Sequence, residues 1–145
     1  MIALLQRVLE SKVVVGGKTI GSIDQGLMVL LGVEKNDDQA IADKLLQRIL
    51  KYRVFSDAEE RMNLSLQDVS GGLLLVPQFT LAADTQSGLR PSFSSAAPPQ
   101  QGKELFDYFV EQARTHYDKV ECGKFGADMK VHLINDGPVT IHLKI

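Results

Sequence analysis

A chain of 145 residues with 44% hydrophobic and 23% charged residues has the composition of an ordinary globular protein, and we expect one domain over residues 1–145. Its net charge of −2 argues against broad electrostatic binding to a nucleic-acid duplex. Recognition of a short single-stranded end or of a small molecule stays open.

The single cysteine, Cys122, excludes an intramolecular disulfide and fits a reducing compartment. A lone cysteine beside a glycine is more often incidental than nucleophilic. No apolar run reaches membrane-spanning length, and the N-terminus has charges within it and no small-residue cleavage pattern. We therefore expect a cytoplasmic protein with no membrane contact.

The first third of the chain reads as strands followed by a helix. Residues 1–15 predict a strand, residues 16–17 a glycine turn, and residues 18–23 a second strand. Residues 26–33 form a continuous apolar strand of the kind that is covered on both faces. Acidic and amide side chains at residues 36–38 are candidate helix caps, and helical spacing follows at Ile41, Leu45 and Ile49.

The middle of the chain contains its most informative stretch. Residues 53–55 predict a short strand, and residues 56–67 are polar and turn-like, with Met62 and Leu64 as anchors. An apolar strand follows at residues 73–76, and the triplet Gln78, Phe79 and Thr80 comes directly after it. Polar groups at the end of a core strand suit a binding site, although they also suit a plain strand end that meets solvent.

The last third begins with a loop at residues 84–99, which is long enough to suggest that it lines a site. Pro98 and Pro99 can open a helix, whose apolar stripe is Leu105, Phe106, Phe109, Val110 and Ala113.

Three further strands end the chain. Val120 centres a short one, and residues 129–133 and 139–145 alternate apolar and polar side chains on either side of Asn135–Pro138. The order of elements predicts an α/β fold, a mixed sheet with two main helices packed on one side.

Several kinds of chemistry have no signal in the sequence. The histidines, His116, His132 and His142, have no partners at metal-ligand spacing, so we expect no metal and no cofactor. There is no GxSxG elbow, Walker A loop or GxGxxG. If the chain is an enzyme, no motif in the sequence identifies a side-chain general base.

Six blocks, in order and over nearly the whole length, resemble the D-aminoacyl-tRNA deacylases. They are MIALLQRV, LLGVEKND, YRVFSD followed by MNLSL, QFTLAAD, LRPSFS and ADMKVHLINDGPVT. The resemblance implies β/β/α layers with barrel-like packing of sheets at a homodimer interface. It also implies cleavage of the ester between a D-amino acid and the 3′ adenosine of tRNA.

The resemblance further implies that Gly137-Pro138 has a cis peptide bond and points its carbonyl oxygens into the partner's pocket. There they would hold the substrate's ammonium, so that a D side chain points outward and an L side chain meets rigid main chain. Glycine has no side chain to reject, so glycyl-tRNA should also be hydrolysed. From the residues alone, Asn135–Pro138 is a plain β-turn.

The family's catalytic residues correspond to Gln78, Phe79 and Thr80. Either the Thr80 hydroxyl attacks the ester, or N–H groups near Phe79 and Thr80 form an oxyanion hole and the ribose 2′-OH assists. We favour the second mechanism because no base accompanies Thr80.

The remaining site residues are Arg7, expected to brace the Gly-Pro segment, and Phe125 and Met129, expected to line the pocket or to be plain core. One departure from the family is Pro77, where a serine is usual, and proline lacks the backbone N–H. Two other functions stay open: a non-catalytic dimer that binds a small amine or a nucleotide 3′ end, and a purely structural dimer.

Overall fold

The structure is a computed structural model that describes residues 1–145. Its helices are α1 (Gln39–Lys51), α2 (Leu66–Val69), the short 3-10 helix η1 (Phe79–Ala82) and α3 (Pro99–His116). Its strands are β1 (Ile2–Val15), β2 (Lys18–Ile23), β3 (Gly26–Gly32), β4 (Phe55–Ser56), β5 (Met62–Leu64), β6 (Gly72–Pro77), β7 (Val120–Cys122) and β8 (Lys130–Lys144).

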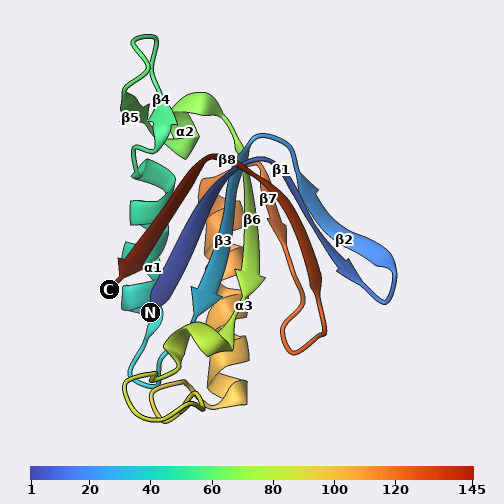
Figure 1. Cartoon of the computed structure of the whole chain (residues 1–145), viewed down its shortest axis with the longest axis vertical. Helices are drawn as coiled ribbons and strands as arrows, with labels where there is room; N and C mark the ends of the chain where they lie inside the picture. The colour runs from blue at the N-terminus through green and yellow to red at the C-terminus, as the bar shows by residue number, and fades with distance from the viewer.

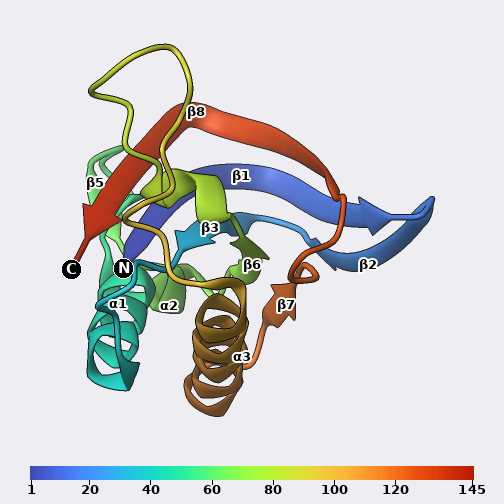
Figure 2. The ribbon, with the colours of Figure 1, turned by 90° about the horizontal axis from the view of Figure 1, so that it is seen from below.

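The main sheet is mixed, with the strand order β2-β1-β3-β6-β7 and with β8 paired to β1. β1 pairs antiparallel with β2, β3 and β8, whereas β3, β6 and β7 run parallel to one another. The first half of β1 lies between β3 and β8 and its second half between β2 and β8, so the sheet curls (Figure 1). Figure 2 shows α1 and α3 on one side of β3 and β6, and β8, which curls over from β1, on the other side, which confirms the predicted class.

Two cores hold this arrangement together, and β6 contributes to both. Leu73 and Leu75 belong to the larger core, between the sheet and the helices. Leu74 and Val76 belong to a smaller core that the curled strands enclose. Because alternate side chains of a strand point to opposite faces, both faces of β6 are buried. This explains why the stretch is apolar without interruption.

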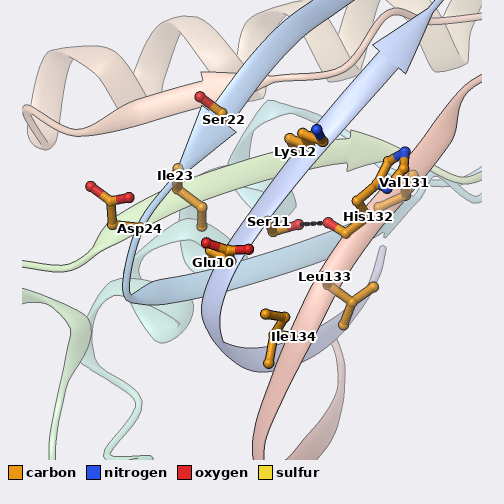
Figure 3. Close-up of a pocket in the computed structure, with 10 residues that line it drawn as sticks. All are labelled: Glu10, Ser11, Lys12, Ser22, Ile23, Asp24, Val131, His132, Leu133 and Ile134. Carbon is orange, nitrogen blue, oxygen red and sulfur yellow. Dashed lines mark hydrogen bonds between the residues drawn. The ribbon is translucent and has the colours of Figure 1, made fainter.

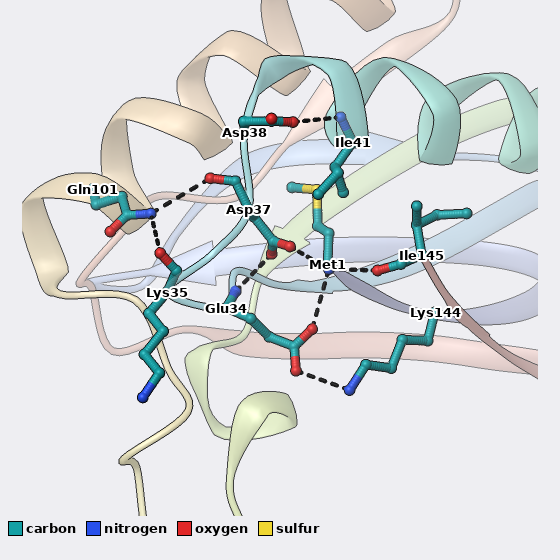
Figure 4. A network of polar contacts seen from close by, with 9 residues as sticks. All are labelled: Met1, Glu34, Lys35, Asp37, Asp38, Ile41, Gln101, Lys144 and Ile145. Carbon is teal, nitrogen blue, oxygen red and sulfur yellow. Dashed lines mark hydrogen bonds and ion pairs between the residues drawn. The ribbon is translucent and has the colours of Figure 1, made fainter.

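The two ends of the chain meet in a polar cluster beside α1 (Figure 4). The Met1 ammonium lies 2.6 Å from the Asp37 carboxylate, 3.2 Å from that of Glu34 and 3.2 Å from the Ile145 carbonyl oxygen. Glu34 also accepts a hydrogen bond of 2.9 Å from Lys144. The cluster therefore ties β1, β8 and the segment before α1 to one another.

The prediction of two separate C-terminal strands is wrong, and so is the plain β-turn at Asn135–Pro138. Residues 130–144 form the single strand β8. Gln6 pairs with Thr140 and Val8 with Asn135, so four residues of β8 face only Arg7 of β1. The segment bulges out of the ladder and the chain continues in the same direction, because the extra residues leave the pairing on both sides intact.

Two short helices were not predicted. Helix α2 begins with a capping box, in which Ser65 accepts from the Asp68 N–H and the Asp68 carboxylate accepts from the Ser65 N–H. The Ser-x-x-Asp spacing carried this signal in the sequence. One residue separates helix η1 from the end of β6, so Phe79 and Thr80 of the predicted polar triplet are helical and not part of the strand. The strand predicted at 53–55 is β4, displaced to Phe55–Ser56.

No helix of the structure combines the length and the apolar character needed to cross a bilayer.

Candidate functional site

The polar triplet lies where β6 gives way to η1. The Gln78 N–H donates to the Leu31 carbonyl oxygen at 2.7 Å, which holds the end of β6 against β3. The Gln78 side-chain amide donates to the Thr80 hydroxyl oxygen. The hydrogen-bond partner of the Thr80 hydroxyl is therefore an amide and not a general base.

The main chain at the start of η1 presents free donors. The N–H groups of Phe79 and Thr80 open this helix and so have no intrahelical acceptors, and the Gln78 side chain does not cap them. Both residues are exposed. Two adjacent N–H groups without acceptors can bind an oxygen that carries developing negative charge.

The long loop after η1 is anchored beside it. Asp84 bridges to Ser92 within the loop, and Ala96 bridges to Glu34 at the end of β3. The Phe79 ring, 58% exposed, packs against the Phe93 ring at a centroid distance of 5.1 Å. The loop at residues 84–99 therefore packs beside η1.

A cavity of about 250 Å³ lies between η1, the start of α3 and the segment after β7. Phe125 lines it and rests against Gly102, where an added Cβ would lie 3.3 Å from the phenyl Cζ atom. Phe106 completes the aromatic wall, 6.4 Å from Phe125 between ring centroids. None of the residues that line the cavity is titratable. The cavity therefore suits a flat, largely apolar group such as a nucleobase.

Met129 takes a different place from Phe125. A Cβ added at Gly123 would lie 2.8 Å from the Met129 sulfur and 3.4 Å from Pro77 Cδ, so Met129 packs beside Pro77. It contacts the smaller core and does not line the cavity. Sequence reasoning missed Gly102, Phe93 and Phe106 as parts of this region; the only signal was a glycine within an amphipathic helix and the phenylalanine of LRPSFS.

Arg7 contacts the bulge of β8. Its guanidinium donates to the Asp136 carbonyl oxygen at 3.1 Å and lies 3.3 Å from the Asp136 carboxylate. A third bond of 2.7 Å goes to the Val54 carbonyl oxygen. Gly137 follows with φ = +122°, and its peptide bond to Pro138 is cis. Both residues of the pair are exposed.

The two predicted parts of the site lie apart within one chain. Along the strands, the Gly137-Pro138 bulge lies opposite Arg7 of β1. Arg7 pairs with Leu27 of β3, and Leu27 pairs with Leu73 of β6, so Leu73 marks the same height in the sheet. Pro77 lies four residues beyond Leu73, a rise of about 13 Å, and β6 is three strand spacings, about 14 Å, from β8. Figure 1 shows η1, after the tip of β6, at the opposite end of the sheet from the bend of β8.

A second hollow, of about 670 Å³, lies between β1, β2 and β8 (Figure 3). Its lining includes Glu10, Lys12, Asp24 and His132, and the Ser11 hydroxyl donates to the His132 carbonyl oxygen at 2.7 Å. None of the predicted site residues lines it.

Comparison with solved structures defines the class of fold. A structure named "c-Myc DNA Unwinding Element Binding Protein" superposes with a TM-score of 0.96 at 40% identity, covering 100% of this chain and 99% of that one. A "probable eukaryotic D-amino acid tRNA deacylase" superposes with a TM-score of 0.85 at 19% identity, covering 99% and 98%. The curled mixed sheet with its helices is therefore the deacylase fold.

Sequence comparison then gives the family. Residues 4–144 match the family described as D-Tyr-tRNA(Tyr) deacylase. The D-aminoacyl-tRNA deacylase of Stutzerimonas stutzeri strain A1501 is 62% identical over 144 residues, and that of Pseudomonas fluorescens strain Pf-5 is 65% identical over 144 residues. Each match covers 99% of both chains. The chain belongs to the D-aminoacyl-tRNA deacylase family.

Proposed function

We propose that this chain is a homodimeric hydrolase that releases a D-amino acid from the 3′ adenosine of tRNA. In each site, one subunit contributes η1 and its cavity, and the other contributes Gly137-Pro138. The observation that carries the proposal is the separation of these two parts within one chain, since both are exposed and neither meets the other. A twofold dimer would complete two equivalent sites.

The cavity would take the adenine of the terminal nucleotide. Phe125 and Phe106 offer an apolar aromatic surface, and Phe79, which also lines the cavity, begins η1 together with Thr80. The ester carbonyl would bind the N–H groups of Phe79 and Thr80, which stabilise the charge that develops when the ester is attacked. Because no titratable side chain lines the cavity, the ribose 2′-OH of the substrate would assist the reaction.

The partner's main chain would discriminate between D- and L-aminoacyl groups. The carbonyl oxygens of Gly137 and Pro138 would accept hydrogen bonds from the substrate's ammonium and fix its position. With the ammonium and the ester fixed, an L side chain would point into main chain, and a D side chain would point to open space. Rejection by collision discriminates more strongly than an added apolar contact.

Pro77 bears on the strength of substrate binding. Its ring lines the cavity, and it contributes no backbone N–H there. In this chain the contribution of the family's serine at this position would therefore be absent, and aromatic and apolar contacts would hold the base.

The experiment that tests the proposal compares release of D-tyrosine from D-tyrosyl-tRNA with release of L-tyrosine from L-tyrosyl-tRNA. We expect rapid hydrolysis of the D ester and only background hydrolysis of the L ester. Sedimentation of the same preparation should give the mass of a dimer. Binding of either tRNA without hydrolysis would instead support the non-catalytic module.

A further inference from the structure

A basic groove leads away from the cavity along α3. Its volume is about 670 Å³, and its floor is formed by α3 on one side and by β7 and the residues after it on the other. Three cationic side chains line it, those of Lys103, Arg114 and Lys124, together with the carboxylates of Asp107 and Glu111. The three cations outnumber the two carboxylates by one, in a chain whose net charge is −2.

The groove is continuous with the cavity. Phe106 and Phe125 line both spaces, one from α3 and one from the segment after β7. Lys103 follows Gly102, which lies under the Phe125 ring, and Lys124 precedes Phe125. A ligand whose flat end occupies the cavity can therefore extend into the groove that Lys103 and Lys124 line.

Two of the three cations have no ion-pair partner. Lys103 bonds the Asp107 carboxylate at 2.5 Å. The only polar contact of the Arg114 guanidinium is the Cys122 sulfur at 3.7 Å. Lys124 donates only through its backbone N–H, to the Met129 sulfur at 3.4 Å, and its ammonium makes no contact. An unpaired guanidinium and an unpaired ammonium facing one groove are suited to phosphate oxygens.

We propose that this groove holds the backbone of the unpaired 3′ nucleotides that precede the terminal adenosine. Arg114 and Lys124 contact phosphates, and Lys103 contacts a third when it leaves Asp107. The proposal rests on the proposed function, since it starts from an adenosine in the cavity. Lys103 and Arg114 are eleven residues apart on α3, about 16 Å. That length suits a short single strand, and the two carboxylates in the groove disfavour the denser charge of a duplex.

The test separates contacts to the terminal adenosine from contacts to the rest of the 3′ end. The double variant Arg114→Ala, Lys124→Ala is assayed on D-tyrosyl-tRNA and on the D-tyrosyl ester of adenosine alone. We expect KM for the tRNA to rise about tenfold with kcat unchanged, and both constants for the adenosine ester to stay as in the wild type. The slope of log affinity against log salt should fall by about 0.7 for each lost phosphate contact.

The charge-matched control is the double variant Lys44→Ala, Lys51→Ala on α1. It should leave KM and kcat unchanged for both substrates. Glu111→Gln should act in the opposite direction and lower KM for the tRNA. An equal loss of kcat/KM on both substrates in the Arg114→Ala, Lys124→Ala variant would overturn the proposal, and so would an unchanged KM for the tRNA. If the wild type cleaves neither ester, the proposed function fails. The groove is then judged separately by the salt dependence with which a short RNA ending in adenosine binds the wild type and the double variant, and equal slopes would refute it.

Discussion

The Arg7 guanidinium binds both the carbonyl oxygen and the carboxylate of Asp136, the residue directly before Gly137-Pro138. A bond to the Val54 carbonyl oxygen fixes the other side of the guanidinium. Arg7 therefore links the bulge of β8 to the segment between α1 and β4. A planar group with several fixed donors can make these contacts together, whereas an ammonium cannot.

We expect Arg7→Lys to reduce kcat/KM for D-tyrosyl-tRNA by at least about tenfold, because hydrogen bonds from a charged donor contribute about 1.5–3 kcal/mol each. The variant should still be folded, as judged by circular dichroism. Asp136→Asn is the matched control, since it keeps the main-chain acceptor at position 136 and should lose less activity. Similar losses in both variants would assign the effect to the carboxylate instead of the main chain.

We propose that the Thr80 hydroxyl is not the nucleophile. It accepts a hydrogen bond from the Gln78 amide and has no base beside it. Thr80→Ala should therefore keep activity within about fivefold of the wild type, whereas removing a true nucleophile costs on the order of 10⁶ in kcat. Steady-state kinetics on D-tyrosyl-tRNA decides between these values.

A second test of the mechanism uses D-tyrosyl-tRNA whose terminal adenosine lacks the ribose 2′-OH. We expect that D-tyrosyl ester to bind and to be hydrolysed only at the background rate. Mass spectrometry of quenched reactions should find no acyl group on Thr80, and detection of an acyl-Thr80 ester would exclude the substrate-assisted mechanism.

The sequence predicted much of the fold because its signals were local. The two-sided burial of β6 follows from its uninterrupted apolar run, and Asp38 caps α1 by accepting from the Ile41 N–H at 2.9 Å, as the acidic cluster suggested. Asn-Asp-Gly-Pro is a strong turn signal, but pairing of β8 with β1 on both sides of it prevails. Tertiary contacts thus override the turn propensity.

The site was harder to predict from residue patterns. Main-chain donors and acceptors leave no trace in side-chain motifs, so the roles that we propose for Phe79 and Gly137 came from the resemblance alone. Phe125 lines the cavity and Met129 packs behind Pro77, a difference that depends on the path of residues 123–129 after β7. No periodicity encodes that path.

Glycyl-tRNA should be a substrate. Glycine lacks the Cβ that would collide with main chain, so a site that rejects by collision has no means of excluding it. Release of glycine should depend on the same residues as release of D-tyrosine, and the Gly137→Ala variant should lose both activities. Background hydrolysis of glycyl-tRNA at high enzyme concentration would show that selection needs a positive contact to the D side chain.

The cluster at the chain ends should make stability depend on pH. Burial tends to raise the pKa of Glu34, but the hydrogen bonds from Lys144 and from the Met1 ammonium outweigh it and hold the pKa below its usual value of 4.5. A carboxyl whose pKa is lower in the folded state stabilises the fold above its unfolded pKa. That stabilisation is lost as the pH falls through the folded pKa.

Glu34→Gln should therefore lower the free energy of unfolding by on the order of 1 kcal/mol at pH 7. The difference from the wild type should shrink below pH 4.5, the usual value for this carboxyl. Urea unfolding between pH 3.5 and pH 7 measures it, with the exposed Glu104→Gln as control. A difference that does not vary with pH would mean that packing, not charge, is responsible.

If each site draws on two subunits, two inactive variants should restore activity when they are combined in one dimer. Gly137→Ala damages the donated segment, since its Cβ would lie 3.0 Å from an Arg7 nitrogen and φ is +122°. Gly102→Leu damages the cavity, where it meets Phe125. Each variant alone should be inactive. After unfolding and refolding together in equal amounts, half of the dimers are mixed and each has one intact site, so we predict about a quarter of wild-type activity. A mixture as inactive as its components would show that no site combines residues of two subunits.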